Sequence, residues 1–124
     1  MFELTVETSF AAAHNLNRYP SPCSRLHGHN WTVAVTVAGK ELNDAGMLVD
    51  FKVLKDTVRD VVGDLDHQYL NELPFFKAGA EPTAENIARL IYEAVTERFS
   101  AYQEIRVKEV KVAESPAAWA VYKP

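Results

Sequence analysis

The stretch CSRLHGHNWTVAVTV (residues 23–37) decides the fold of this chain, because a polar loop turns there into a strand. From Trp31 onward, large apolar residues alternate with smaller or polar ones, which is typical of a half-buried strand. Residues two apart on a strand point to the same face, so His27 and His29 would present two imidazoles side by side, with Gly28 leaving room between them. Two neutral imidazoles on one strand are half of a zinc site, and Cys23 lies one short loop away.

The composition limits the class of protein. A chain of 124 residues is expected to form one domain, residues 1–124, and its 48% hydrophobic and 24% charged content is that of an ordinary globular protein. No run approaches the roughly 18 apolar residues of a membrane helix, and no signal-peptide pattern is evident. The single cysteine excludes an internal disulfide and fits a reducing compartment, so we expect a cytoplasmic protein. The net charge of −4 argues against a nucleic-acid partner, although a local basic cluster could still hold an anionic small substrate.

The periodicity predicts four strands and two helices. Alternation over residues 2–10 predicts a first strand, and its register continues to place His14 on the inward face. Residues 29–38 form the second strand. A helix follows Asp50 as N-cap, with its apolar stripe at Phe51, Leu54, Val58, Val61, Val62 and Leu65. The second helix follows Thr83 as N-cap, with Glu85 in its first turn, where the helix dipole favours an acid.

The chain ends in two further strands. Between residues 105 and 114 the apolar register switches from odd to even positions, which predicts a bulge near Lys108. A turn then leads to a last strand over residues 119–122. The order β-β-α-α-β-β predicts an α+β fold, a four-stranded antiparallel sheet with two helices on one face. If the face that the helices leave open carries Trp31 and the valines of the second strand, further subunits are needed to cover it.

Three of the four histidines, His14, His27 and His29, are placed where they could meet. Three neutral imidazoles with an open fourth position are a catalytic zinc arrangement, since a structural site is normally closed by a fourth ligand. The alternative is that they make ordinary surface hydrogen bonds. The pair on one strand favours the metal, because adjacent imidazoles repel each other when charged. The approach of His14 depends on the pairing of the first two strands.

Two more features carry possible chemistry. Cys23 is either an inert buried thiol or, beside a cation and a base, a thiolate that acts as general base or nucleophile. Asp66 precedes His67. An Asp commonly orients a His that takes the proton from a catalytic thiol, although this pair could simply end a helix. Glu114 could be a solvated residue at a strand end, and Thr83 is adequately explained as a helix cap.

Several blocks together resemble one known family. They are FAAAH (10–14), Cys23 with His27-Gly28-His29, GMLVDF (46–51), LDHQYLN (65–71), PTAEN (82–86) and VAES (112–115). Their order and nearly full coverage are similar to the 6-pyruvoyl-tetrahydropterin synthase family. The three-residue gap between Cys23 and His27 resembles the branch that forms 6-carboxy-tetrahydropterin in the queuosine pathway.

The resemblance implies the tunnelling fold, in which trimers close their sheets into a barrel and pair as homohexamers with active sites between subunits. It also implies a site, with Zn²⁺ held by His14, His27 and His29, a catalytic triad of Cys23, Asp66 and His67, and substrate-binding residues Glu114, Thr83 and Glu85. The implied substrate is 7,8-dihydroneopterin triphosphate, converted to 6-carboxy-5,6,7,8-tetrahydropterin with release of triphosphate and acetaldehyde. The pyruvoyl-forming activity, a non-catalytic zinc or pterin-binding module, and a generic zinc hydrolase remain the alternatives.

Overall fold

The structure, a computed structural model, describes all residues from 1 to 124. It contains one five-stranded sheet whose strands lie in the order β3-β1-β2-β4-β5. The strands are β1 (Phe2–His14), β2 (His27–Gly39), β3 (Gln68–Tyr69), β4 (Ile105–Ser115) and β5 (Ala118–Tyr122). β3 runs parallel to β1, and the other neighbours are antiparallel. The α+β class is therefore confirmed, whereas the expected four-stranded, purely antiparallel sheet is wrong.

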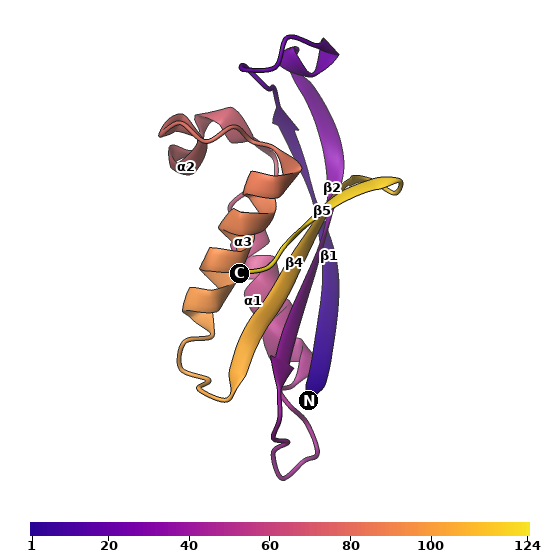
Figure 1. Cartoon of the computed structure of the whole chain (residues 1–124), viewed down its shortest axis with the longest axis vertical. Coiled ribbons are helices and arrows are strands. Elements are labelled where there is room, and N and C mark those ends of the chain that lie inside the picture. The colour runs from indigo at the N-terminus through magenta and orange to yellow at the C-terminus, as the bar shows by residue number, and fades with distance from the viewer.

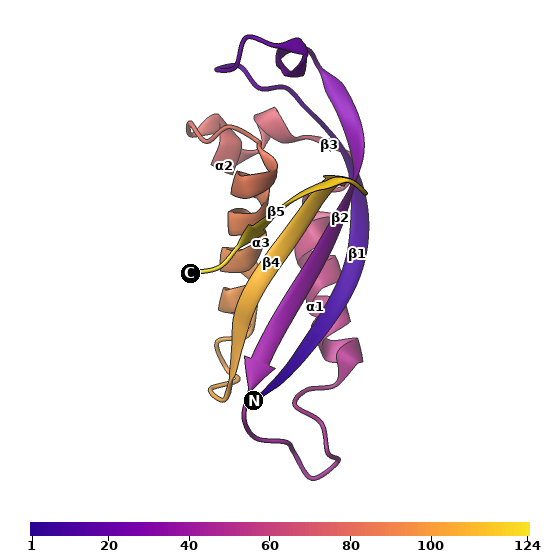
Figure 2. The same cartoon turned by 45° about the vertical axis from the view of Figure 1, so that its right-hand side comes forward.

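Two long helices, α1 (Phe51–Gly63) and α3 (Ala84–Arg98), cover one face of the sheet (Figures 1 and 2). Both begin at the expected caps. The Asp50 carboxylate accepts a hydrogen bond from the Lys52 N–H at 2.8 Å, and the Thr83 hydroxyl accepts one from the Asn86 N–H at 3.2 Å. The short helix α2 (Pro74–Lys77) and the 3₁₀ turns η1 (Pro22–Ser24) and η2 (Leu70–Glu72) lie in the connections. None of the helices is long and apolar enough to span a membrane.

The core lies between the helices and the sheet. Trp31 and the valines at 33, 35 and 37 of β2 are fully buried there, in one cluster of 24 residues. The helices therefore cover the apolar face, and the open face does not carry Trp31 and these valines, so the condition under which further subunits would have to cover them is not met. The open face is built from small and polar residues, and Thr5 and Thr36 share a hydrogen bond of 2.7 Å between their hydroxyls. Phe51, placed in the stripe of α1, is 58% exposed.

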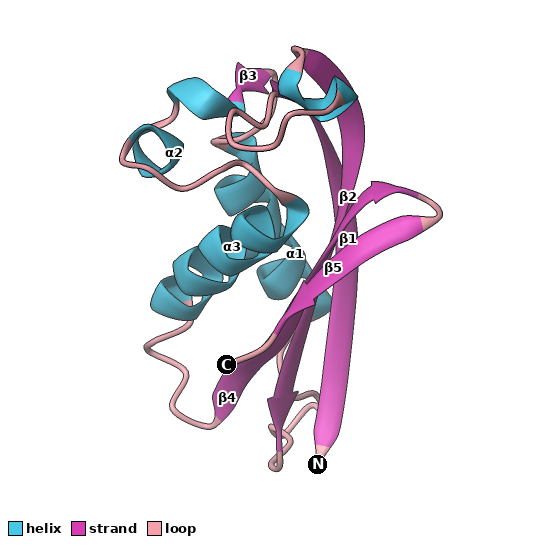
Figure 3. Ribbon diagram, turned by 45° about the horizontal axis from the view of Figure 1, so that its top comes forward, coloured by secondary structure: helices cyan, strands magenta, loops and turns pink.

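The two long strands β1 and β2 extend beyond the helices. β1 and β2 pair over all 13 residues, from Phe2 opposite Gly39 to His14 opposite His27. Their far end projects past α3, toward α2 and η1 (Figure 3). The bulge in β4 is confirmed, since Thr36 pairs with Glu109 and Val37 with Val107, which leaves Lys108 as the extra residue. The bulge directs the even-numbered end of β4 toward the helix face, the same face as the histidines.

Candidate metal centre and active site

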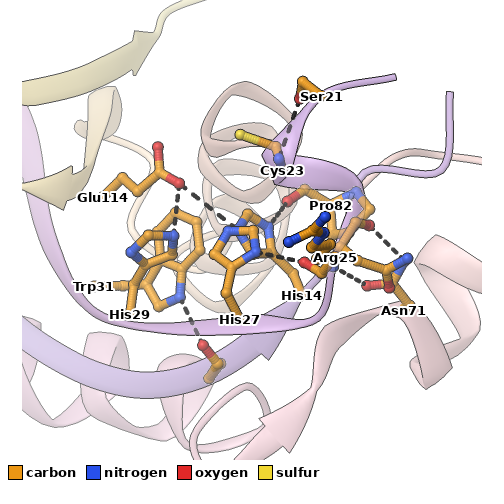
Figure 4. A network of polar contacts seen from close by, with 12 residues as sticks. His14, Ser21, Cys23, Arg25, His27, His29, Trp31, Asn71, Pro82 and Glu114 are labelled. Carbon is orange, nitrogen blue, oxygen red and sulfur yellow. Dashed lines mark hydrogen bonds and ion pairs between the residues drawn. The ribbon is translucent and has the colours of Figure 1, made fainter. Parts of the chain in front are cut away.

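The pairing of β1 with β2 brings three histidines together. His14 lies opposite His27, and Ala12 lies opposite His29, so all three imidazoles project from the helix face. Their ring centroids lie 4.5 Å apart for His14 and His27, 5.2 Å for His14 and His29, and 4.8 Å for His27 and His29 (Figure 4). A two-residue period on one strand and a fixed register with its neighbour are sufficient to build this cluster.

Backbone carbonyls orient two of the rings. His14 Nδ1 lies 2.7 Å from the Pro82 oxygen, and His27 Nδ1 lies 2.7 Å from the Arg25 oxygen. A carbonyl only accepts, so each Nδ1 carries a proton, and in the neutral ring Nε2 then keeps its lone pair. Metal-bound histidines are held in this way by a partner on the second nitrogen.

The inward nitrogens form no aligned hydrogen bond in the protein. His14 Nε2 and His29 Nε2 are both buried, and the polar atom that faces them is a carboxylate oxygen of Glu114, which can only accept. Most buried polar atoms in proteins are paired, so two adjacent orphans require an explanation. A cation between them supplies one, because it would take up both lone pairs.

Glu114, near the end of β4, completes the cluster. Its Oε1 lies 2.7 Å from His29 Nε2 and 3.6 Å from His14 Nε2. One ligand atom from each of the three histidines and Glu114 lies within 4.8 Å of the others, so the group could hold a metal ion.

Burial favours the neutral form of His14. Its side chain lies in the core, and this desolvation lowers the pKa of the His14 imidazole. The hydrogen bond to the Pro82 carbonyl opposes the shift, and the neighbouring His27 and His29 add to it. Trp31 forms a wall of the site, with its ring centroid 5.0 Å from that of His14. The neutral form is the one that binds a metal.

Asp66 and His67 form a hydrogen-bonded pair at the outer edge of β1. Asp66 Oδ1 accepts from the Ala11 N–H at 2.9 Å, and its Oδ2 lies 2.9 Å from His67 Nδ1. The Ala11 N–H bond, followed by the bond from His67, holds the pKa of the Asp66 carboxyl below its usual value. His67 has a φ of +58°, a left-handed conformation that is unusual for a residue with a side chain, and its side chain is 82% exposed. The pair is ordered but lies outside the metal cluster.

The remaining expected site residues lie around the cluster without joining it. Cys23 lies in η1, where its N–H donates to the Ser21 hydroxyl at 3.1 Å, and in the view of Figure 4 it lies above the three histidines. The Thr83 hydroxyl is occupied as the cap of α3, and Glu85 is exposed. Sequence reasoning missed the contribution of Pro82, whose carbonyl holds His14. A backbone acceptor leaves no signal in residue type.

Comparison with known proteins identifies the family of the chain. Residues 3–124 match the family model described as 6-pyruvoyl tetrahydropterin synthase. The chain belongs to this family.

Its relatives include proteins of both branches of the 6-pyruvoyl tetrahydropterin synthase family. It is 39% identical to a Bacillus subtilis 6-carboxy-5,6,7,8-tetrahydropterin synthase, over 99% of this chain and 86% of that protein. It is 40% identical to a Synechocystis protein of the same name, over 78% of this chain and 77% of that protein. The 6-pyruvoyl tetrahydropterin synthase of Caenorhabditis elegans has the same fold, with a TM-score of 0.84 and 28% identity over 100% of this chain and 97% of that one.

Membership in the 6-pyruvoyl tetrahydropterin synthase family confirms the resemblance seen in the sequence. It also confirms that the protein is an enzyme, a lyase, and so excludes the non-catalytic binding module.

Proposed function

We propose that the protein converts 7,8-dihydroneopterin triphosphate to 6-carboxy-5,6,7,8-tetrahydropterin, a step of queuosine biosynthesis in the cytoplasm. The observation that carries the proposal is the convergence of three histidines and Glu114 on one point. The names of the relatives at 39–40% identity favour the carboxy product. The C. elegans 6-pyruvoyl enzyme, similar at 28% identity, keeps the pyruvoyl product as the second candidate.

Zinc is the metal that we propose for the cluster. His14, His27 and His29 would hold it through Nε2, since the Pro82 and Arg25 carbonyls already occupy Nδ1 of the first two. Three imidazoles are a ligand set that suits zinc and leaves a position for substrate. When bound, zinc supplies a Lewis acid that acidifies the side-chain hydroxyls of the pterin.

Glu114 would hold the pterin ring. A carboxylate accepts hydrogen bonds, and the pterin presents an amino group and a ring N–H as donors. The segment with Thr83 and Glu85 would border the ring. Glu114 contacts His29 at 2.7 Å, so its carboxylate would have to turn to reach the substrate.

Proton transfer is assigned to Cys23, Asp66 and His67. Cys23 as thiolate would remove a proton from a side-chain carbon, and His67, oriented by Asp66, would carry protons to and from the substrate. The His67 side chain points into open space at the edge of β1, so we propose that it serves the site of a neighbouring subunit. Strand edges are natural surfaces for such contacts, and the outer edge of β1 pairs with β3 only at Ala12 and Ala13.

Assembly into trimers, and of these into hexamers, would close the sheets into a barrel. The lumen would then be lined by the small and polar open face of the sheet. Such a lumen does not need to exclude water, which agrees with the charged and hydroxyl side chains there, such as Glu7 and Thr32.

The proposed reaction balances without a redox cofactor. The pyrazine ring gains the hydrogens that the side chain loses. Cleavage of the side chain then leaves the 6-carboxyl group and releases triphosphate and acetaldehyde, with one water consumed. No nicotinamide is required.

A product assay tests the proposal. Zinc-loaded enzyme is incubated with 7,8-dihydroneopterin triphosphate, and the pterins and acetaldehyde are quantified by chromatography and mass spectrometry. We expect 6-carboxy-tetrahydropterin and acetaldehyde in equal amounts. Formation of 6-pyruvoyl-tetrahydropterin alone would make the second candidate correct. The Cys23→Ala variant should retain zinc and lose most turnover; an active Cys23→Ala enzyme would contradict the role of the thiol.

A further inference from the structure

We infer that Asn71, acting through Asn15, is a positioning residue that sets the place of Cys23 relative to His14. Its side-chain amide bonds to both backbone groups of Asn15. The Asn15 N–H donates to Asn71 Oδ1 at 3.0 Å, and Asn71 Nδ2 donates to the Asn15 oxygen at 2.8 Å. Asn71 therefore gives Asn15 the two bonds that a neighbouring strand would provide. Asn15 follows His14 directly in the chain.

The side chain of Asn15 reaches the other way, into the loop that carries Cys23. Its Nδ2 donates to Asn17 Oδ1 at 2.7 Å and to the Ser24 oxygen at 3.3 Å, while its Oδ1 accepts from the Tyr69 hydroxyl. These bonds use every polar group of Asn15.

A backbone bond supports the same loop. The Leu16 N–H donates to the Cys23 oxygen at 2.9 Å. Cys23 is thereby held on one side by the residue after Asn15, and its neighbour Ser24 is held by Asn15 itself. A displacement of Asn15 would move both attachments of η1 together.

The segment that carries Asn71 also carries the Asp66–His67 pair. The His67 N–H donates to the Ala11 oxygen at 2.6 Å, Asp66 accepts from the Ala11 N–H, and β3 pairs with Ala12 and Ala13. Asn71 continues this pairing past the end of β1. One edge thus fixes three parts of the site, namely the acid–base pair, the end of the strand with His14, and the Cys23 loop. Figure 4 shows Asn71, His14 and Cys23 of this arrangement.

A positioning role of Asn71 and a purely structural role predict different effects of its substitution. A residue that only stabilises the fold would lower the melting temperature and leave the folded enzyme equally active. Loss of a positioning contact lowers kcat in the folded enzyme, because misplacement by about 1 Å can cost ~100-fold in rate. The inference rests on the proposed role of Cys23, so its test also needs a readout that does not depend on turnover. Cys23 is the only cysteine, and alkylation by iodoacetamide therefore reports on this loop alone.

The test compares three variants with the wild-type enzyme. Asn71→Leu removes both bonds at nearly constant size, Asn71→Asp keeps only the acceptor, and Asn15→Asp keeps the acceptor toward Tyr69 but releases Asn17 and Ser24. For Asn71→Leu we expect kcat to fall roughly 10–100-fold with KM changed less than about threefold, since Glu114 is untouched. We expect alkylation of Cys23 to become at least about threefold faster as the loop loosens. The two Asp variants should show smaller changes of the same sign, and they keep the test valid if Asn71→Leu does not fold.

Asn43→Ala is the matched control. Asn43 also organises a loop, accepting from the Ala45 and Met47 N–H groups at 2.9 and 3.1 Å, but that loop lies at the opposite end of the molecule (Figure 1). This variant should keep wild-type kcat and alkylation rate.

The outcomes separate the inference from the proposed function. If folded, metal-loaded Asn71 and Asn15 variants keep the wild-type alkylation rate, the inference is wrong, whatever their kcat. If alkylation accelerates but Cys23→Ala remains active, the positioning of the loop stands and the proposed chemistry of Cys23 is wrong.

Discussion

Zinc should stabilise the protein strongly by binding to Nε2 of His14, His27 and His29. The Nε2 atoms of His14 and His29 are buried and form no aligned hydrogen bond, and both face a carboxylate oxygen of Glu114. The Pro82 and Arg25 carbonyls bind Nδ1 of His14 and His27, which directs Nε2 of these two rings toward the cluster. The folded protein therefore offers a preformed site that the unfolded chain lacks, and zinc binding is linked to folding.

The size of the effect follows from linkage. Free zinc at 100 times its dissociation constant adds about 2.7 kcal/mol to the free energy of unfolding. An unfolding entropy of about 2.1 cal/mol/K per residue gives ~0.26 kcal/mol/K for 124 residues. The melting temperature should therefore rise by about 10 °C, and by ~5 °C more for each further tenfold increase in free zinc.

Thermal unfolding of metal-free protein in a series of buffered zinc concentrations measures this shift. His14→Ala and His27→Ala should each lose most of it, compared with the same variant without metal. His67→Ala is the control, because this exposed imidazole lies outside the cluster and its variant should keep the full shift. A melting temperature that does not depend on zinc, in a protein that remains folded, would refute the metal site.

Three further outcomes follow from contacts in the site. Burial lowers the pKa of His14 below the usual value of about 6.5 for histidine, so below about pH 6.5 the unfolded chain binds the proton more readily than the folded one. The free energy of unfolding of metal-free protein, measured in urea, should thus decrease as the pH falls from 7.5 to 5.5, and His14→Gln should weaken this pH dependence. An equal pH dependence in the wild type and His14→Gln would contradict the contribution of His14. Trp31→Phe removes the bond from Nε1 to the Ala12 oxygen (3.3 Å) and leaves a cavity, so we expect a loss of about 2–3 kcal/mol in urea unfolding; a loss below about 0.5 would contradict the packing described. Glu114→Gln keeps an acceptor but loses the charge, and KM for the pterin should rise roughly tenfold while the enzyme still binds zinc; an unchanged KM would remove Glu114 from the substrate site.

The sequence predicts those parts of the fold that have a period or a cap. Alternation identified the long strands, and Asp50 and Thr83 marked the helix starts. β3 was missed because two residues have no period and pair through backbone atoms alone. The sequence left open which face of the sheet the helices cover, because alternation separates the two faces but does not identify the one that packs against the helices. Trp31 shares its odd register with His27 and His29, which places the metal cluster on the helix-covered face.

For the site, too, some features were predictable from the sequence and others were not. The spacing of His27 and His29 and the register of His14 were sufficient to predict the cluster. The groups that orient the rings were not predictable, because the Pro82 and Arg25 carbonyls belong to the backbone. Asn71 stood in the motif LDHQYLN, but its two bonds to Asn15 depend on tertiary structure.

The exposed position of His67 leads to a last prediction. Its backbone is held at a φ of +58° and its ring is bonded to Asp66, yet the side chain is 82% exposed and is not part of the histidine–glutamate cluster of its own chain. A preorganised group of this kind is useful if the neighbouring subunit brings its Cys23 and metal to it. Cys23→Ala and His67→Ala should then be inactive alone and active when unfolded and reassembled together. In a random equal mixture a site receives an intact Cys23 with probability one half and an intact His67 with probability one half, so about a quarter of wild-type activity should return. If both residues came from the same chain, every site would lack one of them and the mixture would stay inactive, and the shared site would be wrong.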